Sequence, residues 1–159
     1  MRDIFLKLTG IDGESQDAKH VGEIDVLCWD WKITQRSSMH SGSGGGAGKA
    51  TVGDLVFDHY IDRASPNLFR YCVTGKHIES AVLVARKAGG SPLEYLKMTM
   101  NDVIVTGVSS SLYTTMPRLR EEVQLSIARV IQDYVIQNAQ GGSGGTVSAA
   151  FDIQANREI

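Results

Sequence analysis

Apolar and polar residues alternate most clearly in residues 24–33, which read Ile-Asp-Val-Leu-Cys-Trp-Asp-Trp-Lys-Ile. The side chains of a β-strand point alternately to its two faces, so this pattern predicts a strand. One face then carries Leu27, Trp29, Trp31 and Ile33, and the other carries Val26, Cys28, Asp30 and Lys32. We expect the first face to belong to the core and the second, mixed face to lie toward solvent or a partner.

Similar runs of apolar and β-branched residues predict strands along most of the remaining chain. They cover residues 4–8, 50–58, 78–86, 93–111, 121–137 and 146–153, with glycine-rich turns at 89–92 and 141–145. This succession of strands and glycine turns is typical of an antiparallel β fold.

One helix is predicted over residues 65–75. Ser65 suits the N-cap, Pro66 suits the first helical position and Gly75 suits the C-cap. Four apolar residues share one face of this helix, which we expect to pack against an opening or side of a barrel: Leu68, Phe69, Cys72 and Val73.

Together these elements predict a mainly β fold. We expect a small β-barrel of two packed antiparallel sheets with one flanking α-helix at about residues 65–75 and a long glycine-rich loop. The chain shows no internal repeat and no shift of composition that marks a boundary, so residues 1–159 are predicted to form a single domain.

The glycine-rich loop has almost no side chains. It reads Ser41-Gly42-Ser43-Gly44-Gly45-Gly46-Ala47-Gly48 and is followed by Lys49. A compact domain keeps so long a loop mainly for function or for a partner to order it. It is not a phosphate-binding loop, because Ser43 stands where that pattern needs glycine and Ala50 follows the lysine in place of Ser or Thr. A strand, and no helix N-terminus, comes next.

Charge and hydropathy exclude two classes of partner. The chain has 18 acidic and 16 basic side chains and a net charge of −2, which gives no electrostatic reason to bind nucleic acid or an anionic membrane. No apolar run approaches the length of a membrane span, and the first residues lack the apolar core of a signal peptide. We therefore expect a protein folded in the cytoplasm whose export, if any, uses another machine.

The residues that usually bind metals or form disulfides make no recognisable pattern. Cys28 and Cys72 are expected to act as small buried hydrophobes, and a Cys28–Cys72 bridge is the alternative. The histidines at positions 20, 40, 59 and 77 lack the spacing of metal ligands. The sequence therefore predicts no metal site.

Catalytic motifs are also missing from the sequence. Ser143 lies in Gly-Gly-Ser-Gly-Gly, but no helix follows it as a nucleophile elbow requires. Asp25 and Asp30 fall on opposite faces of one strand and so do not form a carboxylate pair. We predict no enzyme and no cofactor.

A series of short motifs runs through nearly the whole chain. It begins with Gly13-Glu14-Ser15-Gln16-Asp17 and continues with Trp29-Asp30-Trp31, Ser38-Met39-His40, Gly44–Lys49, Ala64–Leu68, Thr74–His77, Arg86–Gly89, Glu94–Leu96 and Asp152-Ile153. In order and spacing these motifs closely resemble the Hcp family, the haemolysin-coregulated tube proteins of bacterial type VI secretion.

The resemblance implies a structural role. An Hcp-like chain is expected to close into a hexameric ring, and rings are expected to stack into a hollow inner tube that a contracting sheath expels. The implied partners are further copies of the chain, the sheath, baseplate and spike proteins, and effector proteins carried and chaperoned in the channel. The resemblance implies no nucleic acid, no membrane insertion, and secretion without a signal peptide.

Two candidate sites follow within such a tube. Residues Ser41–Lys49 are the candidate ring-stacking loop, because a bare backbone packs closely against a neighbouring ring. Asp30 and Lys32 are candidates to face the channel and sort passengers, with ordinary solvated strand residues as the alternative. The two tryptophans are interpreted as core rather than as a ligand-stacking platform.

One segment, Ser109–Arg118, departs from the family pattern of a polar, glycine-rich tip. It carries Leu112, Tyr113 and Met116, and an exposed apolar cluster suggests a contact surface. Three interpretations stay open: stronger ring stacking, a particular partner, or folding back onto the barrel. Ile131 and Phe151 stand where a lysine and a tryptophan are common, which bears on contacts between rings.

Two other classes of function compete with the tube. A small hydrolase needs a convergence of Ser, His and Asp that no motif shows. A secreted effector derived from the tube protein needs an added toxin domain, for which we expect no room in 159 residues.

Overall fold

The structure is a computed structural model that describes residues 2–37, 49–87, 92–111, 115 and 117–159. Within these residues it contains one helix, α1 (Ser65–Thr74). The strands are β1 (Arg2–Leu8), β2 (Ile24–Asp25), β3 (Cys28–Asp30), β4 (Ile33–Thr34), β5 (Thr51–Val52), β6 (Leu55–Tyr60), β7 (His77–Lys87), β8 (Glu94–Ser111), β9 (Arg120–Gln137), β10 (Ser143–Asp152) and β11 (Arg157–Glu158).

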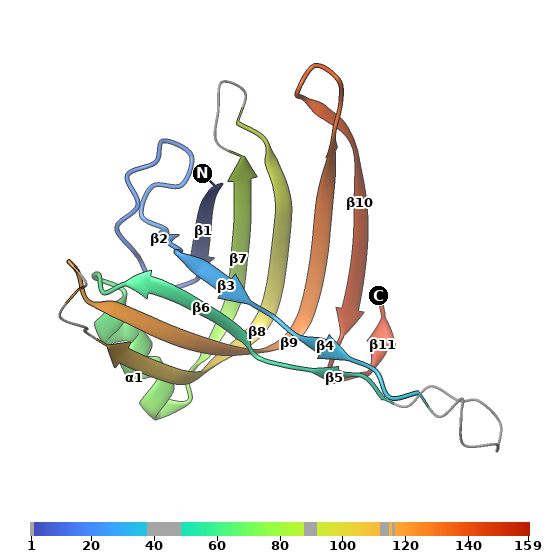
Figure 1. The fold of residues 1–159 in the computed structure, drawn as a ribbon. Helices are drawn as coiled ribbons and strands as arrows, with labels where there is room; N and C mark the ends of the chain where they lie inside the picture. The colour runs from blue at the N-terminus through green and yellow to red at the C-terminus, as the bar shows by residue number, and fades with distance from the viewer. Residues whose placement is uncertain (1, 38–48, 88–91, 112–114, 116) are drawn as a thin grey trace.

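Antiparallel pairing joins nine of these strands into one sheet. Its order is β11-β10-β9-β8-β7-β1-β2, and β6 adds to it by pairing with both β9 and β3 (Figure 1). The two remaining strands, β4 and β5, form a ribbon that projects from the body of the molecule. The mainly β fold with one helix and two antiparallel sheets is confirmed.

The sheet curls because β9 has two partners along one side. Its residues 120–125 pair with β6, whereas its residues 129–137 pair with β10. On its other side β9 pairs with β8 from Arg120 to Tyr134. The first half of β9 therefore belongs to a curled, barrel-like body, and the second half belongs to a flatter extension.

The predicted single strand over residues 24–33 is wrong, because the chain changes partner in its middle. β2 pairs with β1, while β3 pairs with β6. Between them the Val26 N–H donates to the Ile4 carbonyl at 2.9 Å and the Leu27 N–H donates to the Asp58 carbonyl at 2.8 Å. Among the described strands β1 and β6 form no ladder with each other, so this segment bridges a barrel that is not fully closed.

The change of partner also breaks the predicted alternation of faces. Val26 is buried, although it was assigned to the mixed face, and Leu27 and Ile33 are exposed, although they were assigned to the core. Trp29 and Trp31 are partly buried against the core, as predicted. The indole N–H of Trp31 donates to the Gly53 carbonyl at 3.0 Å, which ties the segment to the turn before β6.

The helix has its predicted extent, and Gly75 closes it in a left-handed conformation with φ 67°. Ala64, and not Ser65, is the N-cap. Of the four apolar residues predicted to share a buried face, Leu68 is buried and Cys72 packs partly against the core. Phe69 and Val73 instead point away from the core and are 62% and 67% exposed.

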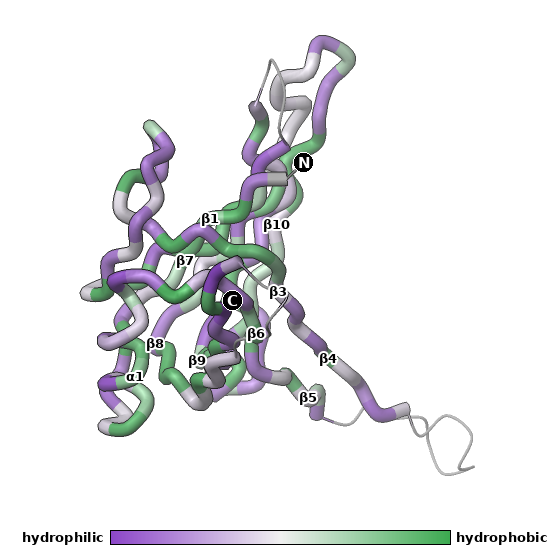
Figure 2. Tube along the Cα trace, turned by 60° about the vertical axis from the view of Figure 1, so that its left-hand side comes forward, coloured by the Kyte–Doolittle hydropathy of each residue, from purple (hydrophilic) through white to green (hydrophobic). Residues whose placement is uncertain are grey.

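The core fills the curled body between the two sides of the sheet. Its members come from β1, β2, β6, β7, β8 and β9 together with Leu68 of α1. The fully buried side chains include Leu6, Ile24, Leu55, Phe57, Leu83, Met98, Met100 and Leu125. The tube view in Figure 2 shows how far β4 and β5 project beyond this body.

Candidate functional site

The core-facing side of the sheet continues beyond the elements that cover it. Residues opposite each other in an antiparallel ladder share a face, and one such row runs across four strands as Leu83, Met98, Gln132 and Ala149. Leu83 and Met98 are fully buried, whereas Gln132 and Ala149 are exposed. The same face is therefore core on β7 and β8 and open surface on β9 and β10.

The open part of this face is apolar. Tyr134 lies opposite Val147, and Ile136 follows two residues along β9 on the same face. The exposed fractions are 47% for Tyr134, 60% for Val147 and 45% for Ile136. We call Tyr134, Ile136, Val147 and Ala149 the apolar strip. A contiguous exposed apolar surface of this kind marks an interaction site.

Next to the strip lies a groove of about 420 Å³ between the β4–β5 ribbon and the strands β9, β10 and β11. Its walls are mostly apolar, and Glu158 is the one charged residue among the described residues that line it. The lining residues are Trp31, Ile33, Val130, Gln132, Ala149, Ala150, Phe151 and Glu158. The strip and the groove share Ala149 and form one surface.

The outer edge of β10 adds backbone groups to this surface. β11 pairs only with Phe151 and Asp152, so within the described strands the edge from Ser143 to Ala149 has no ladder partner. This stretch contains neither a charged residue nor proline, the usual devices that block pairing with another chain. The edge is therefore chemically suited to strand pairing.

A second feature is a buried polar cluster of Ser65, Glu121 and His59, which are the residue types of a catalytic triad. The Ser65 hydroxyl donates to Glu121 Oε2 at 2.8 Å, and His59 Nε2 lies 2.7 Å from the same oxygen. The order of contacts is Ser–Glu–His, so the serine meets a carboxylate and not the histidine that a nucleophile needs. Glu121 and His59 are 3% and 0% exposed. This cluster anchors the start of α1 and offers no accessible nucleophile.

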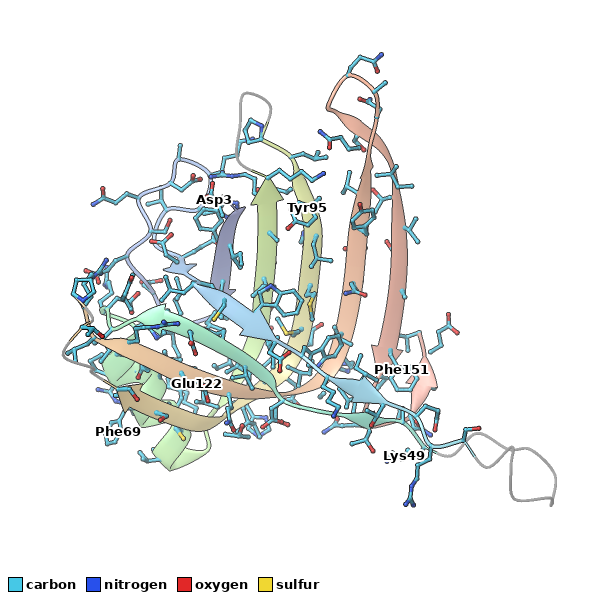
Figure 3. All side chains as sticks on the ribbon, in the orientation of Figure 1. Asp3, Lys49, Phe69, Tyr95, Glu122 and Phe151 are labelled. Carbon is cyan, nitrogen blue, oxygen red and sulfur yellow. The ribbon has the colours of Figure 1, made fainter. Side chains whose placement is uncertain are left out.

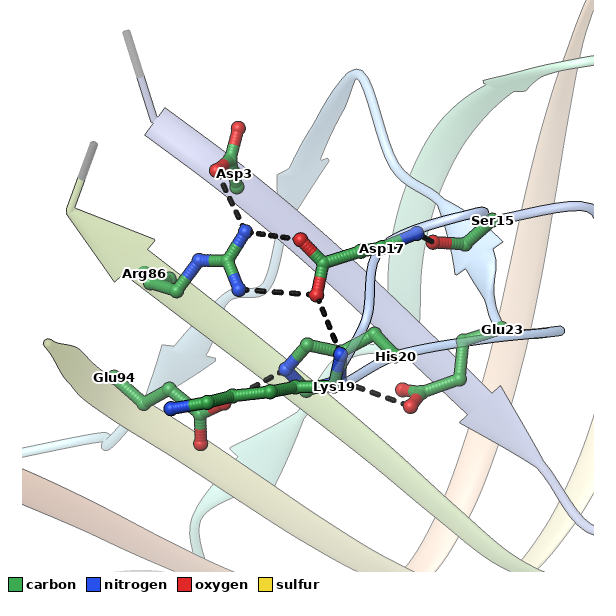
Figure 4. Close-up of polar contacts among 8 residues, drawn as sticks. All are labelled: Asp3, Ser15, Asp17, Lys19, His20, Glu23, Arg86 and Glu94. Carbon is green, nitrogen blue, oxygen red and sulfur yellow. Dashed lines mark hydrogen bonds and ion pairs between the residues drawn. The ribbon is translucent and has the colours of Figure 1, made fainter. Parts of the chain in front are cut away.

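A third feature is the loop after β1, which a polar network fastens to the sheet (Figure 4). Arg86 of β7 donates to Asp3 of β1 at 3.0 Å and to both carboxylate oxygens of Asp17 in the loop. These hydrogen bonds from the guanidinium lower the pKa of Asp17 to about 2 and raise the pKa of Arg86. We call this set of contacts the loop clasp.

His20 completes the loop clasp. Its Nδ1 lies 2.9 Å from Glu23 Oε2, and its Nε2 lies 2.7 Å from Glu94 Oε1 of β8. The imidazole also stacks on Phe5, with 4.3 Å between ring centroids. The loop that the sequence marked only as polar is therefore fixed to β1, β7 and β8.

The predicted site residues are only partly placed. Residues 41–48 of the stacking loop and the apolar residues Leu112, Tyr113 and Met116 lie outside the described residues. Lys49 is exposed at the start of the chain that returns through β5, and Asp30 and Lys32 are both exposed. Asp30, Lys32 and Lys49 are not among the residues that line the pocket beside Arg86.

The expectation of two buried cysteines is wrong for one of them. Both thiols are free, and Cys28 is exposed while Cys72 is half-buried. Desolvation and the nearby Asp58 carboxylate raise the pKa of the Cys28 thiol, so it is not an activated nucleophile. Cys28 is exposed because it follows the change of partner at Val26–Leu27.

The described residues contain no group of three or more His, Cys, Asp or Glu side chains placed to hold a metal ion. In the same part of the chain, no helix combines the length and the apolar character needed to cross a membrane.

Sequence reasoning missed the apolar strip. A signal for it exists, because apolar residues occupy both faces in the second half of β9, at Val130, Ile131, Tyr134, Val135 and Ile136. A strand with one solvated face shows apolar residues at every second position only.

The chain is similar to known proteins over nearly its whole length. The family model described as "Type VI secretion system effector, Hcp" matches residues 5–134. The Hcp1 protein of Pseudomonas aeruginosa is 46% identical over 156 residues, covering 97% of this chain and 96% of that protein.

Solved structures show the same likeness. The crystal structure of Hcp1 from Salmonella typhimurium is 55% identical, with a TM-score of 0.84 and 99% of each chain covered. A type VI secretion system effector from Yersinia pestis is 43% identical, with a TM-score of 0.78 and coverage of 94% of this chain and 99% of that one.

Proposed function

Because this chain belongs to the Hcp family of the type VI secretion system and is a structural subunit of its tube, we propose that the apolar strip and the groove beside it close the subunits into a hexameric ring. The observation that carries this proposal is the core-facing side of β9 and β10, which no other described part of the chain covers. A second copy supplies the missing cover.

Ring closure also accounts for the unprotected edge of β10. The uncharged edge from Ser143 to Ala149 is a liability in a monomer, because it invites uncontrolled strand pairing. In a closed ring each such edge lies against the next subunit, and no edge is left over. The edge lies on β10, which also carries Val147 and Ala149 of the apolar strip, so one contact covers both.

Stacking of rings is assigned to a different part of the chain. The β4–β5 ribbon projects from the body, and Lys49 lies exposed at its far end (Figure 3). We propose the stacking contact for the loop Ser41–Lys49, of which only Lys49 belongs to the described residues. Asp30 and Lys32, both exposed, are proposed to face the channel and to sort passenger effectors by charge.

The remaining partners follow from the role of a tube. The sheath, baseplate and spike proteins of the secretion machine are its proposed contacts, and the chain is proposed to leave the cytoplasm through that machine. We propose no catalytic role. The Ser65–Glu121–His59 cluster is buried and has the wrong order of contacts for a nucleophile.

Light scattering of the purified protein across a concentration series, with negative-stain images of the same samples, tests ring formation. We expect the mass of a hexamer and annular particles, with longer stacks at the highest concentrations. A mass that stays that of one chain at every concentration contradicts the proposed ring.

A further inference from the structure

The outer face of α1 is unusually apolar for an exposed helix surface. Pro66, Phe69, Arg70 and Val73 are all exposed, with 62% of Phe69 and 67% of Val73 open to solvent. At about 100° per residue these positions fall within an arc of about 100° around the helix. They form a convex ridge of three apolar side chains with one cation beside them, which we call the helix ridge.

The groove described above is the counterpart of this ridge in shape and charge. It is concave, with Ile33 and Phe151 among its apolar walls, and Glu158 places a carboxylate in its lining. An apolar ridge flanked by Arg70 matches an apolar groove that contains Glu158. Neither surface has a partner among the described residues of its own chain.

The two surfaces lie too far apart to meet within one molecule. Phe69 and Phe151 are at opposite ends of the body, with the sheet between them (Figure 3). The same separation appears between α1 and β5 in the rotated view of Figure 2. Complementary patches on opposite ends of one chain produce a head-to-tail contact, the kind that closes into a ring.

We propose that the helix ridge of one copy docks into the groove of the next copy, with Phe69 and Val73 against the groove walls and Arg70 facing Glu158. The inference rests on the proposed ring and specifies which surface of the neighbour meets the groove. A second copy is the partner because each chain offers one ridge and one groove. In a closed ring every ridge and every groove is then used once.

Disulfide cross-linking tests the contact directly. The variant carries Phe69→Cys and Ile33→Cys in a background without native thiols, Cys28→Ser and Cys72→Ala. A disulfide forms only where the two Cα atoms come within about 7 Å. Oxidation is expected to give a ladder of covalent multimers on a denaturing gel, which collapses to monomer on reduction.

Two matched controls separate docking from chance collisions. Phe69→Cys alone is expected to give no species above a dimer. Phe69→Cys combined with Lys97→Cys, an exposed position on β8, is expected to give no ladder. A ladder of equal intensity in this second control overturns the proposal.

A charge exchange provides an independent second measurement. Arg70→Glu and Glu158→Arg are each expected to weaken association several-fold in a dilution series, and the double variant is expected to recover it. If the rings keep their full mass but neither the cross-link nor the recovery occurs, the docking is wrong and the ring itself stands. If no ring forms in the unmodified protein, the proposed function fails and the docking fails with it.

Discussion

At the scale of single residues, Gly13 shows how closely the loop clasp is packed. A Cβ built on Gly13 would lie 2.5 Å from the Glu23 carbonyl oxygen and 2.8 Å from the Ile24 Cα. Its N–H donates to the Gly22 carbonyl at 2.8 Å, so the backbone around it is fixed from both sides. Only glycine fits this close approach of two backbone segments.

We predict that Gly13→Ala destabilises the fold by about 2 kcal/mol, because an added methyl group must displace backbone atoms. The matched control is Gly142→Ala, whose nearest new contact is a side-chain atom of Asn138 at an ordinary 3.5 Å. That control is expected to change the free energy of unfolding by less than about 0.5 kcal/mol. Urea unfolding measures the free energy of unfolding of both variants, and equal effects in the two would contradict the close packing proposed at Gly13.

The limits of sequence reasoning are clearest for single side chains. Periodicity predicted Trp29 and Trp31 as core, and both are partly buried against it, but it misplaced Val26, Leu27 and Ile33. Alternation predicts faces only while a strand keeps one set of neighbours. The partner change between Val26 and Leu27 depends on distant hydrogen bonds to Ile4 and Asp58, and no local pattern contains that information.

At the scale of elements, the loop clasp fastens the segment before β2 to three strands. Asp17 accepts from Arg86 of β7, and the same guanidinium reaches Asp3 of β1. Folding lowers the pKa of Asp17 from its ordinary 3.8 to about 2, so the folded state binds the proton less well than the unfolded chain. The stabilisation is therefore complete above the ordinary pKa and is lost as the pH falls toward 2.

We predict this dependence from a comparison of the wild-type protein with Asp17→Asn. The difference in their free energies of unfolding is expected to be constant above pH 5 and to shrink steadily between pH 4 and pH 2. The pKa values of Asp25 and Asp62, which burial raises, contribute in both variants and largely cancel. Denaturant unfolding at several pH values measures the free energy of unfolding of both proteins. A difference between them that is the same at pH 5 and pH 2 contradicts the role of the loop clasp.

The bounds of the helix and the long strands were easier to predict than the face that each turns to the core. Pro66 and Gly75 marked the ends of α1, and the long strands β8 and β9 have nearly their predicted bounds. The prediction of which side of α1 faces the core was correct only in part, because Leu68 packs inward and Phe69 points out. A helix with apolar residues over a wide arc has no unique inner side until its neighbours are known.

At the scale of the whole molecule, the sequence predicted the fold class and the family but not the surface proposed for assembly. The family motifs run along nearly the entire chain, whereas the apolar strip exists only because β10 carries the sheet beyond the curled body. The strip is exposed because no other described element lies over this face of β9 and β10. That is a property of the arrangement in space and of no single segment.

The role of the apolar strip in ring closure is tested by a matched pair of variants on β10. Val147 lies in the strip, and its neighbour Thr146 is also exposed but points to the opposite face of the sheet. Val147→Asp and Thr146→Asp add the same charge one residue apart. Circular dichroism spectra like that of the wild-type protein establish that both variants are folded.

The measurement is the solution mass of both variants by light scattering at one concentration. We expect Val147→Asp to have the mass of a single chain, because a carboxylate is costly to bury in an apolar contact, while Thr146→Asp keeps the mass of the ring. If Val147→Asp keeps the ring mass, the apolar strip does not close the ring.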